Sequence, residues 1–147
     1  MTIWIFGDSF ADQYTPANTW MQQVADAVNH DPKFFGKGGT SLDYTYEKFN
    51  EVRDQINDND IVILALTDLS RRWFFRDEAN ETIWETMKKG GKIGTAVTQY
   101  LKYLTNDHVY ILYLTNFLYN LQHLTRQHNT HTIVLPCFDF VCEETEK

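Results

Sequence analysis

A Gly-Asp-Ser triplet near the start of the chain is the first feature whose residue types could do chemistry. Gly7, Asp8 and Ser9 come directly after an apolar run at residues 3–6, which is typical of a buried strand. A serine at the turn that leaves a strand exposes its hydroxyl at the sheet edge, where backbone N–H groups can face a developing oxyanion. The triplet therefore predicts a nucleophilic Ser9 with Asp8 beside it. Its simpler interpretation is a cap in which Asp8 and Ser9 close a turn or a helix start.

A glycine pair farther along the chain offers backbone N–H donors to the same reaction. Gly38 and Gly39 follow the second predicted strand, and glycine lets a backbone approach a reacting group closely. The pair is equally typical of a flexible turn followed by a helix cap from Thr40, Ser41 or Asp43. Both interpretations can hold together. The segment lacks the spacing of a phosphate-binding loop, so we expect no nucleotide cradle here.

Two further polar residues follow predicted strands and could assist at the reacting oxygen. Thr67 comes directly after the third strand, and Asn116 comes shortly after the fourth. A hydroxyl and a side-chain amide can each donate a hydrogen bond to an oxyanion. We therefore expect Thr67 and Asn116 at the same edge as Ser9.

A cluster of arginines and aromatic residues also follows the third strand. Arg71, Arg72, Trp73 and the next residues up to Arg76 combine three guanidinium groups with three aromatic rings. Such a set can hold an anionic, sugar or nucleotide-like ligand by forked hydrogen bonds and stacking. The alternative is that the rings pack the crossover onto the core, or form a subunit contact, while the arginines pair with nearby carboxylates.

The elements that must position these residues alternate between short β-rich runs and longer helical patterns, which is typical of βαβ units. This pattern predicts one α/β domain over residues 1–147, with helices on both faces of a five-stranded parallel sheet, a three-layer doubly wound fold. Its strands are predicted over residues 3–6, 33–36, 60–66, 109–114 and 132–136. Its helices are predicted over residues 19–29, 44–56, 92–105 and 116–127, with a loop or short helix over 71–75.

In doubly wound sheets, ligands bind outside the carboxyl ends of the strands, so this topology brings the polar segments together. The same rule disfavours His108 and His131 as catalytic bases, because each precedes a predicted strand and should lie at the opposite edge. His30, His123 and His128 are expected on or beside helices, in solvent.

Composition limits the classes of partner. A formal charge of −7 disfavours an extended nucleic-acid surface, because binding a polyanion relies on clustered Lys and Arg. The longest apolar run, residues 61–66, is far too short to span a membrane, and no export signal is apparent at the N-terminus. Only two cysteines occur, Cys137 and Cys142, which suits a reducing cytoplasm. We expect no cofactor and no metal.

The placed triplet resembles the SGNH/GDSL hydrolases, in which the serine of Gly-Asp-Ser follows the first strand and a glycine follows the second. Ser9 and either Gly38 or Gly39 match those positions. The chain also resembles, more loosely, stand-alone domains of this family from bacteriophage genomes. The resemblance implies a flavodoxin-like strand order and hydrolysis of an ester or an acetylated sugar.

Two departures from the family pattern bear on mechanism. Where the family has Gly-x-Asn-Asp, this chain has Leu66-Thr67-Asp68-Leu69. An ionised Asp68 would repel an oxyanion, so it must be protonated, turned away or paired with an arginine. Where the family has Asp-x-x-His, the nearest frame here is Asp139 to Cys142, a degenerate dyad whose thiol is a poor substitute for imidazole.

Three explanations for the missing histidine are open: the gene product is truncated relative to its relatives, the base comes from elsewhere, or the domain no longer hydrolyses and binds instead. Asp8 could serve as a poor base for Ser9. The leading expectation is a serine ester or acetyl hydrolase, and the alternative is a catalytically inactive binding module, viral or directed at a host protein, that uses the same cleft. A third role is a homo-oligomer that buries the apolar surface left by 15% aromatic content.

Overall fold

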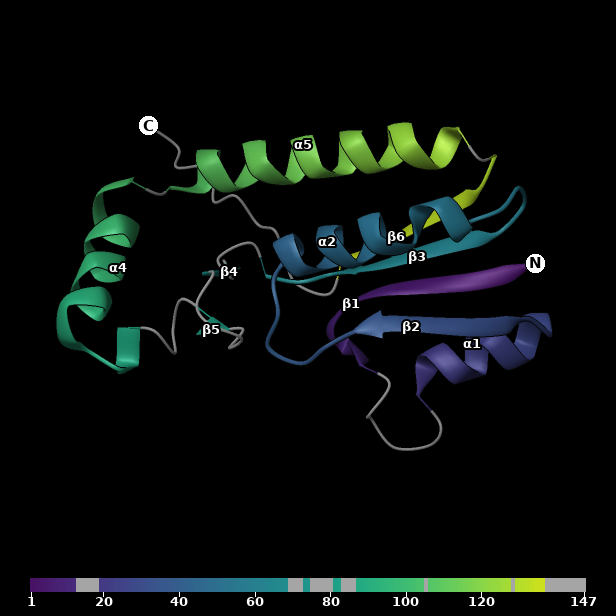
Figure 1. Cartoon of the computed structure of the whole chain (residues 1–147), viewed down its shortest axis with the longest axis horizontal. Coiled ribbons are helices and arrows are strands. Elements are labelled where there is room, and N and C mark those ends of the chain that lie inside the picture. The colour runs from purple at the N-terminus through teal and green to yellow at the C-terminus, as the bar shows by residue number, and fades with distance from the viewer. Residues whose placement is uncertain are drawn as a thin grey trace, which may run out of the picture.

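In the part of the chain that the structure describes, the main sheet holds four parallel strands in the order β2-β1-β3-β6. The computed structural model describes residues 1–12, 19–68, 73–74, 81–82, 87–104, 106–127 and 129–136. The strands are β1 at Thr2–Asp12, β2 at Asp31–Gly36, β3 at Ile61–Leu66 and β6 at His131–Pro136 (Figure 1). The chain is therefore α/β with a parallel sheet, as the alternating pattern predicts.

Helices cover both faces of this sheet. The helices are α1 at Trp20–Val28, α2 at Leu42–Val52, α4 at Gly91–Leu104 and α5 at Asp107–Arg126, with a short 3-10 turn at Arg53–Gln55. Figure 1 shows α1 beside β2 and α2 over β3 and β1, while α4 stands off the end of the sheet. No helix in the described ranges is long and apolar enough to cross a membrane.

The alternation of side chains along β1 and β3 builds a separate apolar core on each face. On the first face, α2 and α5 cover side chains from both strands, and Phe6 stacks on Phe35 with ring centroids 5.0 Å apart. The buried members of this core are Trp4, Phe6, Leu42, Phe49, Val52, Ile56, Val62, Leu64, Leu66, Phe117 and Leu121. On the second face, α1 contributes Met21 and Ala25. They pack with Ile3, Ile5, Ala11, Ile63 and Ala65.

The prediction of a fifth strand over residues 109–114 is wrong, because these residues form the first part of α5. The Asn106 side chain accepts a hydrogen bond of 3.0 Å from the Val109 backbone N–H, which caps the start of the helix. Tyr113 and Leu114 then pack on the first core along with Phe117 and its neighbours. As a result, β6 pairs directly with β3, and the described residues contribute four strands to the sheet.

The predicted loop or short helix over 71–75 also needs correction where the structure describes it. Trp73–Phe74 forms a short strand, β4, which pairs antiparallel with β5 at Glu81–Thr82. These two strands form a separate small sheet, beside the carboxyl ends of the main one in Figure 1.

Hydrogen bonds to Asp60 stabilise the amino edge of the sheet. Its buried carboxylate accepts hydrogen bonds from the Thr2 backbone N–H at 2.7 Å and from the Trp4 indole N–H at 2.9 Å. The Asn57 backbone N–H adds a third at 3.0 Å. Burial alone raises the pKa of Asp60, but these three bonds outweigh it and hold the pKa below its usual value.

A candidate serine site at the carboxyl edge of the sheet

The Gly-Asp-Ser triplet lies in an irregular extension of β1 rather than at the end of a short strand. Gly7 and Asp12 are both paired with Gly36 of β2, so the residues between them bulge out of the sheet. The bulge exposes the side chains of Ser9 and Phe10, and 47% of Phe10 is accessible. The sequence predicts the serine's exposure, while the extension of β1 to Asp12 was not expected.

Two glycines make this bulge sterically feasible. A Cβ at Gly36 would lie 2.0 Å from the carbonyl oxygen of Ala11, because the returning bulge crosses directly over that residue. A Cβ at Gly7 would lie 2.7 Å from the carbonyl oxygen of Ala65 in β3. The glycine of the triplet therefore serves close strand packing at the point where the serine leaves the sheet.

Asp8 points inward from the bulge and is completely buried. Its carboxylate accepts a 2.7 Å hydrogen bond from the hydroxyl of Thr67 and a 3.0 Å hydrogen bond from the backbone N–H of Phe10. Thr67 is also fully buried, and its hydroxyl lies 3.4 Å from the carbonyl oxygen of Thr40. This network fixes the backbone on both sides of Ser9, so Asp8 and Thr67 hold the serine in place.

The loop after β2 lies against Ser9. The backbone N–H of Lys37 donates to the Gly7 carbonyl at 3.3 Å, and the Thr40 hydroxyl donates to the Lys37 carbonyl at 2.7 Å. A Cβ placed on Gly38 would lie 3.8 Å from the Cβ of Ser9, so the two residues are neighbours. Gly39 is exposed, with a φ of 76° that suits glycine.

Asp12 is the member of the site that sequence reasoning missed. Its carboxylate oxygen Oδ2 accepts a 2.8 Å hydrogen bond from the Gly38 backbone N–H. The same oxygen and the Cβ of Ser9 both lie within 4 Å of the point where a Gly38 Cβ would sit. No spacing within β1 signals this, because the bulge that returns Asp12 to Gly36 arises from pairing with β2.

No family model matches this chain, and no curated protein matches it. The residues of the site share one edge of the sheet, where the bulge of β1, the loop after β2 and the end of β3 meet. Within the described ranges, no group of three or more His, Cys, Asp and Glu side chains is placed to hold a metal ion.

The remaining predicted site residues are distributed differently. Asp68 follows Thr67 at the end of β3 and is partly buried. Asn116 does not follow a strand, because it lies on the exposed surface of α5. Trp73 lies in β4, and only its backbone is described. Four predicted residues lie outside the described part of the chain: Arg71, Arg72, Asp139 and Cys142.

His108 lies in the first turn of α5. The expectation that it precedes a strand is therefore wrong, because residues 109–114 are helical. Figure 1 nevertheless shows the start of α5 well apart from the end of β1. His131 begins β6, and its backbone N–H donates to the Asp60 carbonyl at the amino edge. His123 is near the end of α5, and His30 directly precedes β2.

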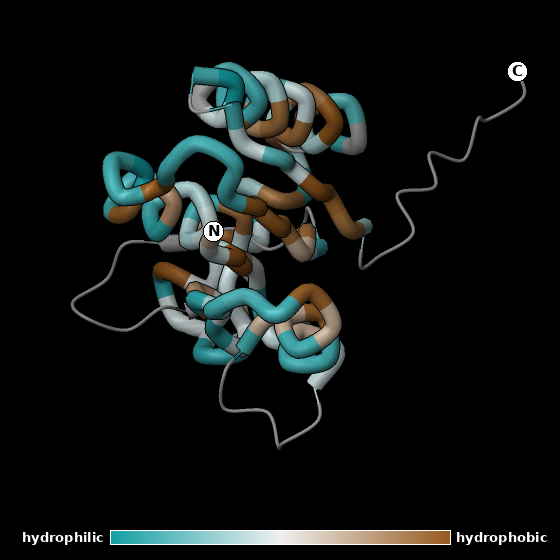
Figure 2. The backbone as a smooth tube through the Cα atoms, turned by 90° about the vertical axis from the view of Figure 1, so that its right-hand side faces the viewer, coloured by the Kyte–Doolittle hydropathy of each residue, from teal (hydrophilic) through white to brown (hydrophobic). Residues whose placement is uncertain are grey.

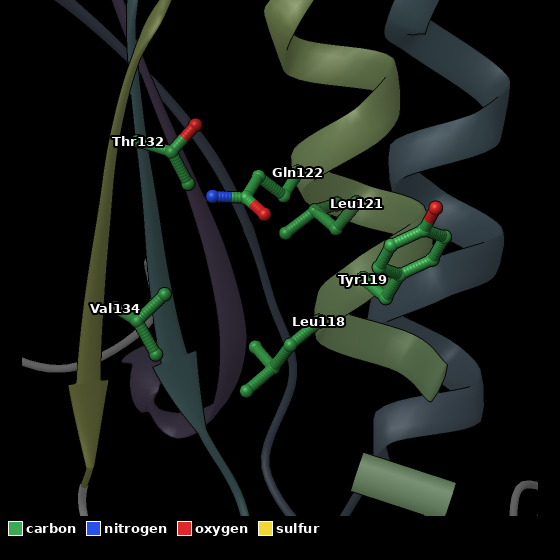
Figure 3. A pocket seen from close by; sticks show the side chains of 6 residues that line it. All are labelled: Leu118, Tyr119, Leu121, Gln122, Thr132 and Val134. Atoms are coloured by element: carbon green, nitrogen blue, oxygen red, sulfur yellow. The ribbon is translucent and has the colours of Figure 1, made fainter. Parts of the chain in front are cut away.

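A hollow of about 410 Å³ lies away from Ser9, between α5 and β6. Figure 3 shows Leu118, Leu121 and Gln122 of α5 projecting toward Thr132 and Val134 of the strand. Tyr119 completes the lining, and most of the lining is apolar. The hollow therefore belongs to the edge of the sheet and takes no part in the serine site.

Proposed function

We propose that this domain hydrolyses small acyl esters with Ser9 as the nucleophile. The observation that carries the proposal is the exposed Ser9 beside the Gly38–Gly39 loop, held by a buried Asp8–Thr67 hydrogen bond. A fixed, exposed hydroxyl next to backbone N–H groups is the arrangement that acyl transfer needs. We also propose that the domain is a member of the SGNH/GDSL hydrolases, which its Gly-Asp-Ser triplet resembles.

The strand order supports the finer fold within this proposal. A flavodoxin-like sheet has the order 2-1-3-4-5, and the sequence β2-β1-β3-β6 follows it up to the fourth position. Ligands of such sheets bind at the carboxyl edge, where Ser9 and Gly38 lie. An acetylated sugar or a similar small ester fits this open edge, because a Cβ added at Gly39 would meet no atom within 4 Å beyond its immediate chain neighbours.

The proposed reaction has two steps. The oxygen of Ser9 attacks the carbonyl carbon, its proton passes to a base, and the negative charge develops on the carbonyl oxygen. The backbone N–H groups of Ser9 and Gly39 are the candidate donors to that oxygen, because Gly38 donates to Asp12. The alcohol leaves with a proton, and water then releases the acid from the acyl-serine.

Covalent labelling tests the nucleophile without knowledge of the natural substrate. We expect a fluorophosphonate probe to add once to the chain, on the peptide that contains Ser9, and the adduct to be absent in Ser9→Ala. The chain has only two other serines, Ser41 and Ser70, so mass spectrometry assigns the site directly. Ser41 is buried and serves as an internal control. A labelled Ser70, or a Ser9→Ala variant that hydrolyses 4-nitrophenyl acetate at the wild-type rate, would remove Ser9 as the nucleophile.

A second candidate function is binding without hydrolysis. It is favoured by the Asp12 carboxylate, which already occupies the Gly38 N–H in the site. In this case an acetylated sugar binds equally well to wild type and Ser9→Ala in calorimetric titrations, and Arg72→Ala or Trp73→Ala weakens it. Turnover well above background that depends on Ser9 excludes this candidate.

We also propose a cellular compartment and an oligomeric state for the domain. The two cysteines support a reducing, cytoplasmic compartment.

Exposed apolar side chains on α5 and β6 support a homo-oligomer, with Leu112 53%, Tyr119 70% and Ile133 45% accessible. Figure 2 shows this part of β6 in brown at the outer side of the sheet, directly before the grey trace to the C-terminus. Sedimentation of the wild type against Ile133→Lys tests the oligomer, which the lysine should dissociate.

A further inference from the structure

We infer that Asp12 is the general base that takes the proton of Ser9. The inference rests on the proposed function, because a base is needed only if Ser9 attacks a substrate. The sequence has no histidine in the Asp-x-x-His frame to act as this base. A carboxylate that belongs to the same bulge as the serine would replace that histidine.

The geometry favours Asp12 over Asp8, the other carboxylate in the irregular part of β1. Asp12 Oδ2 lies 3.4 Å, and the Ser9 Cβ 3.8 Å, from the position that a Gly38 Cβ would occupy. Both groups therefore border the space that a side chain at Gly38 would fill. Asp8 is less suited, because its oxygens accept from Thr67 and from the Phe10 backbone in the buried interior.

The Gly38 N–H positions Asp12 for this role. The 2.8 Å hydrogen bond from Gly38 holds one end of the carboxylate against the loop beside Ser9. A carboxylate can accept several hydrogen bonds at once, so the bond from Gly38 orients Asp12 and does not by itself prevent it from taking a proton. The pairing of Asp12 with Gly36 fixes its backbone as well.

The chemical steps balance without any other group. Asp12 accepts the Ser9 proton as the serine oxygen bonds to the acyl carbon, and the protonated Asp12 returns that proton to the departing alcohol as the ester bond breaks. In the second half, Asp12 accepts a proton from the attacking water. It then gives that proton to the oxygen of Ser9 as the acid is released, which restores the starting state.

Kinetics of Asp12→Asn with 4-nitrophenyl acetate give the first test. The asparagine oxygen can still accept from Gly38, but the amide cannot take a proton at neutral pH. We expect kcat to fall about 100-fold to 10,000-fold, the range for a lost general base, with KM changed by less than about threefold. Asp54→Asn removes the same charge at a side chain that is 90% exposed, and should keep the wild-type rate. Ser9-dependent turnover that survives in Asp12→Asn would overturn the inference and leave the proposed function standing.

Chemical rescue separates a catalytic carboxylate from a structural one. In Asp12→Ala, added sodium formate should restore part of the lost rate in a saturable manner, whereas Ser9→Ala should show no rescue. A structural role would move the thermal midpoint and leave formate without effect, which contradicts the inference. A wild type with no Ser9-dependent turnover at all would instead overturn the proposed function and, with it, the role of Asp12.

Discussion

The hydroxyl of Thr67 and the carboxylate of Asp8, which are 59 positions apart in sequence, share a fully buried hydrogen bond of 2.7 Å. The bond joins the end of β3 to the bulge of β1. Asp8 also accepts from the Phe10 backbone N–H, so the pair determines where the chain on either side of Ser9 lies. The aspartate of the triplet thus has a structural task that is distinct from proton transfer.

Removing the Thr67 hydroxyl should therefore weaken both the fold and the site. Thr67→Val keeps the shape of the side chain but leaves a buried carboxylate oxygen without its donor. We expect a loss of about 2 kcal/mol in the free energy of unfolding in urea, the usual size for a hydrogen bond to a charged group. Thr67→Ser keeps the hydroxyl and should lose less. Equal stability of Thr67→Val and wild type would show that the bond contributes nothing.

Asp60 should make stability depend on pH at the acid end. Its pKa is held below the unfolded value near 3.8, so its contribution is present above that pH and is lost as the pH falls through the lower folded value. Asp60→Asn replaces one carboxylate oxygen with an NH2 group, which cannot accept a hydrogen bond from donors such as the Trp4 indole. The variant should lose about 2 kcal/mol in the free energy of unfolding at pH 7. The gap between variant and wild type should narrow below about pH 4. Asp58→Asn, at an exposed neighbour, should leave the pH profile unchanged.

Two glycine substitutions should separate folding from activity. Gly36→Ala places a methyl group 2.0 Å from the Ala11 carbonyl oxygen, which should cost at least about 3 kcal/mol or prevent folding. Gly38→Ala meets only ordinary contacts, at 3.4 Å and 3.8 Å, so the thermal midpoint should stay close to wild type. Its methyl group, however, fills a space that both Asp12 and Ser9 border. Ester hydrolysis by folded Gly38→Ala at the wild-type rate would contradict the assigned site.

Thr45 offers a substitution that should stabilise the protein. Its Oγ1 is buried, with 1% of the residue accessible, and has no hydrogen-bond partner among the described residues. Thr45→Val replaces this hydroxyl with a methyl group of similar size, and should gain about 1 kcal/mol. In a domain of this length, the thermal midpoint should rise by about 3 °C. Thr45→Ser, which keeps the hydroxyl and loses the methyl group, should lower it.

Local pattern predicts most of the sheet and places the serine. The apolar runs of β1 and β3 and the helical spacing before β2 and β3 all correspond to observed elements. The strand predicted over 109–114 failed because four of its six residues, two tyrosines, a valine and an isoleucine, are of aromatic or β-branched types enriched in strands. The helical spacing of Tyr113, Leu114 and Phe117 carried the correct signal, because it continues without a break into the rest of α5.

The full set of residues in the candidate site was harder to predict from the sequence. Asp8, Ser9 and Gly38 were found because each follows a strand predicted from the sequence. Asp12 was missed because its position depends on a second pairing with Gly36, made after the chain has bulged away from the sheet. Such a register shift is decided by the neighbouring strand, and no pattern within β1 records it.

The indole of Trp4, whose N–H is bound by the buried Asp60 carboxylate, provides a spectroscopic marker at the edge opposite Ser9. Its proton should exchange with deuterium only when the amino ends of β1 and β3 separate. Variants that loosen the bulge around Ser9 can therefore be sorted by exchange. Slow indole exchange means that the disturbance is confined to the carboxyl edge, whereas fast exchange means that the whole sheet is opening.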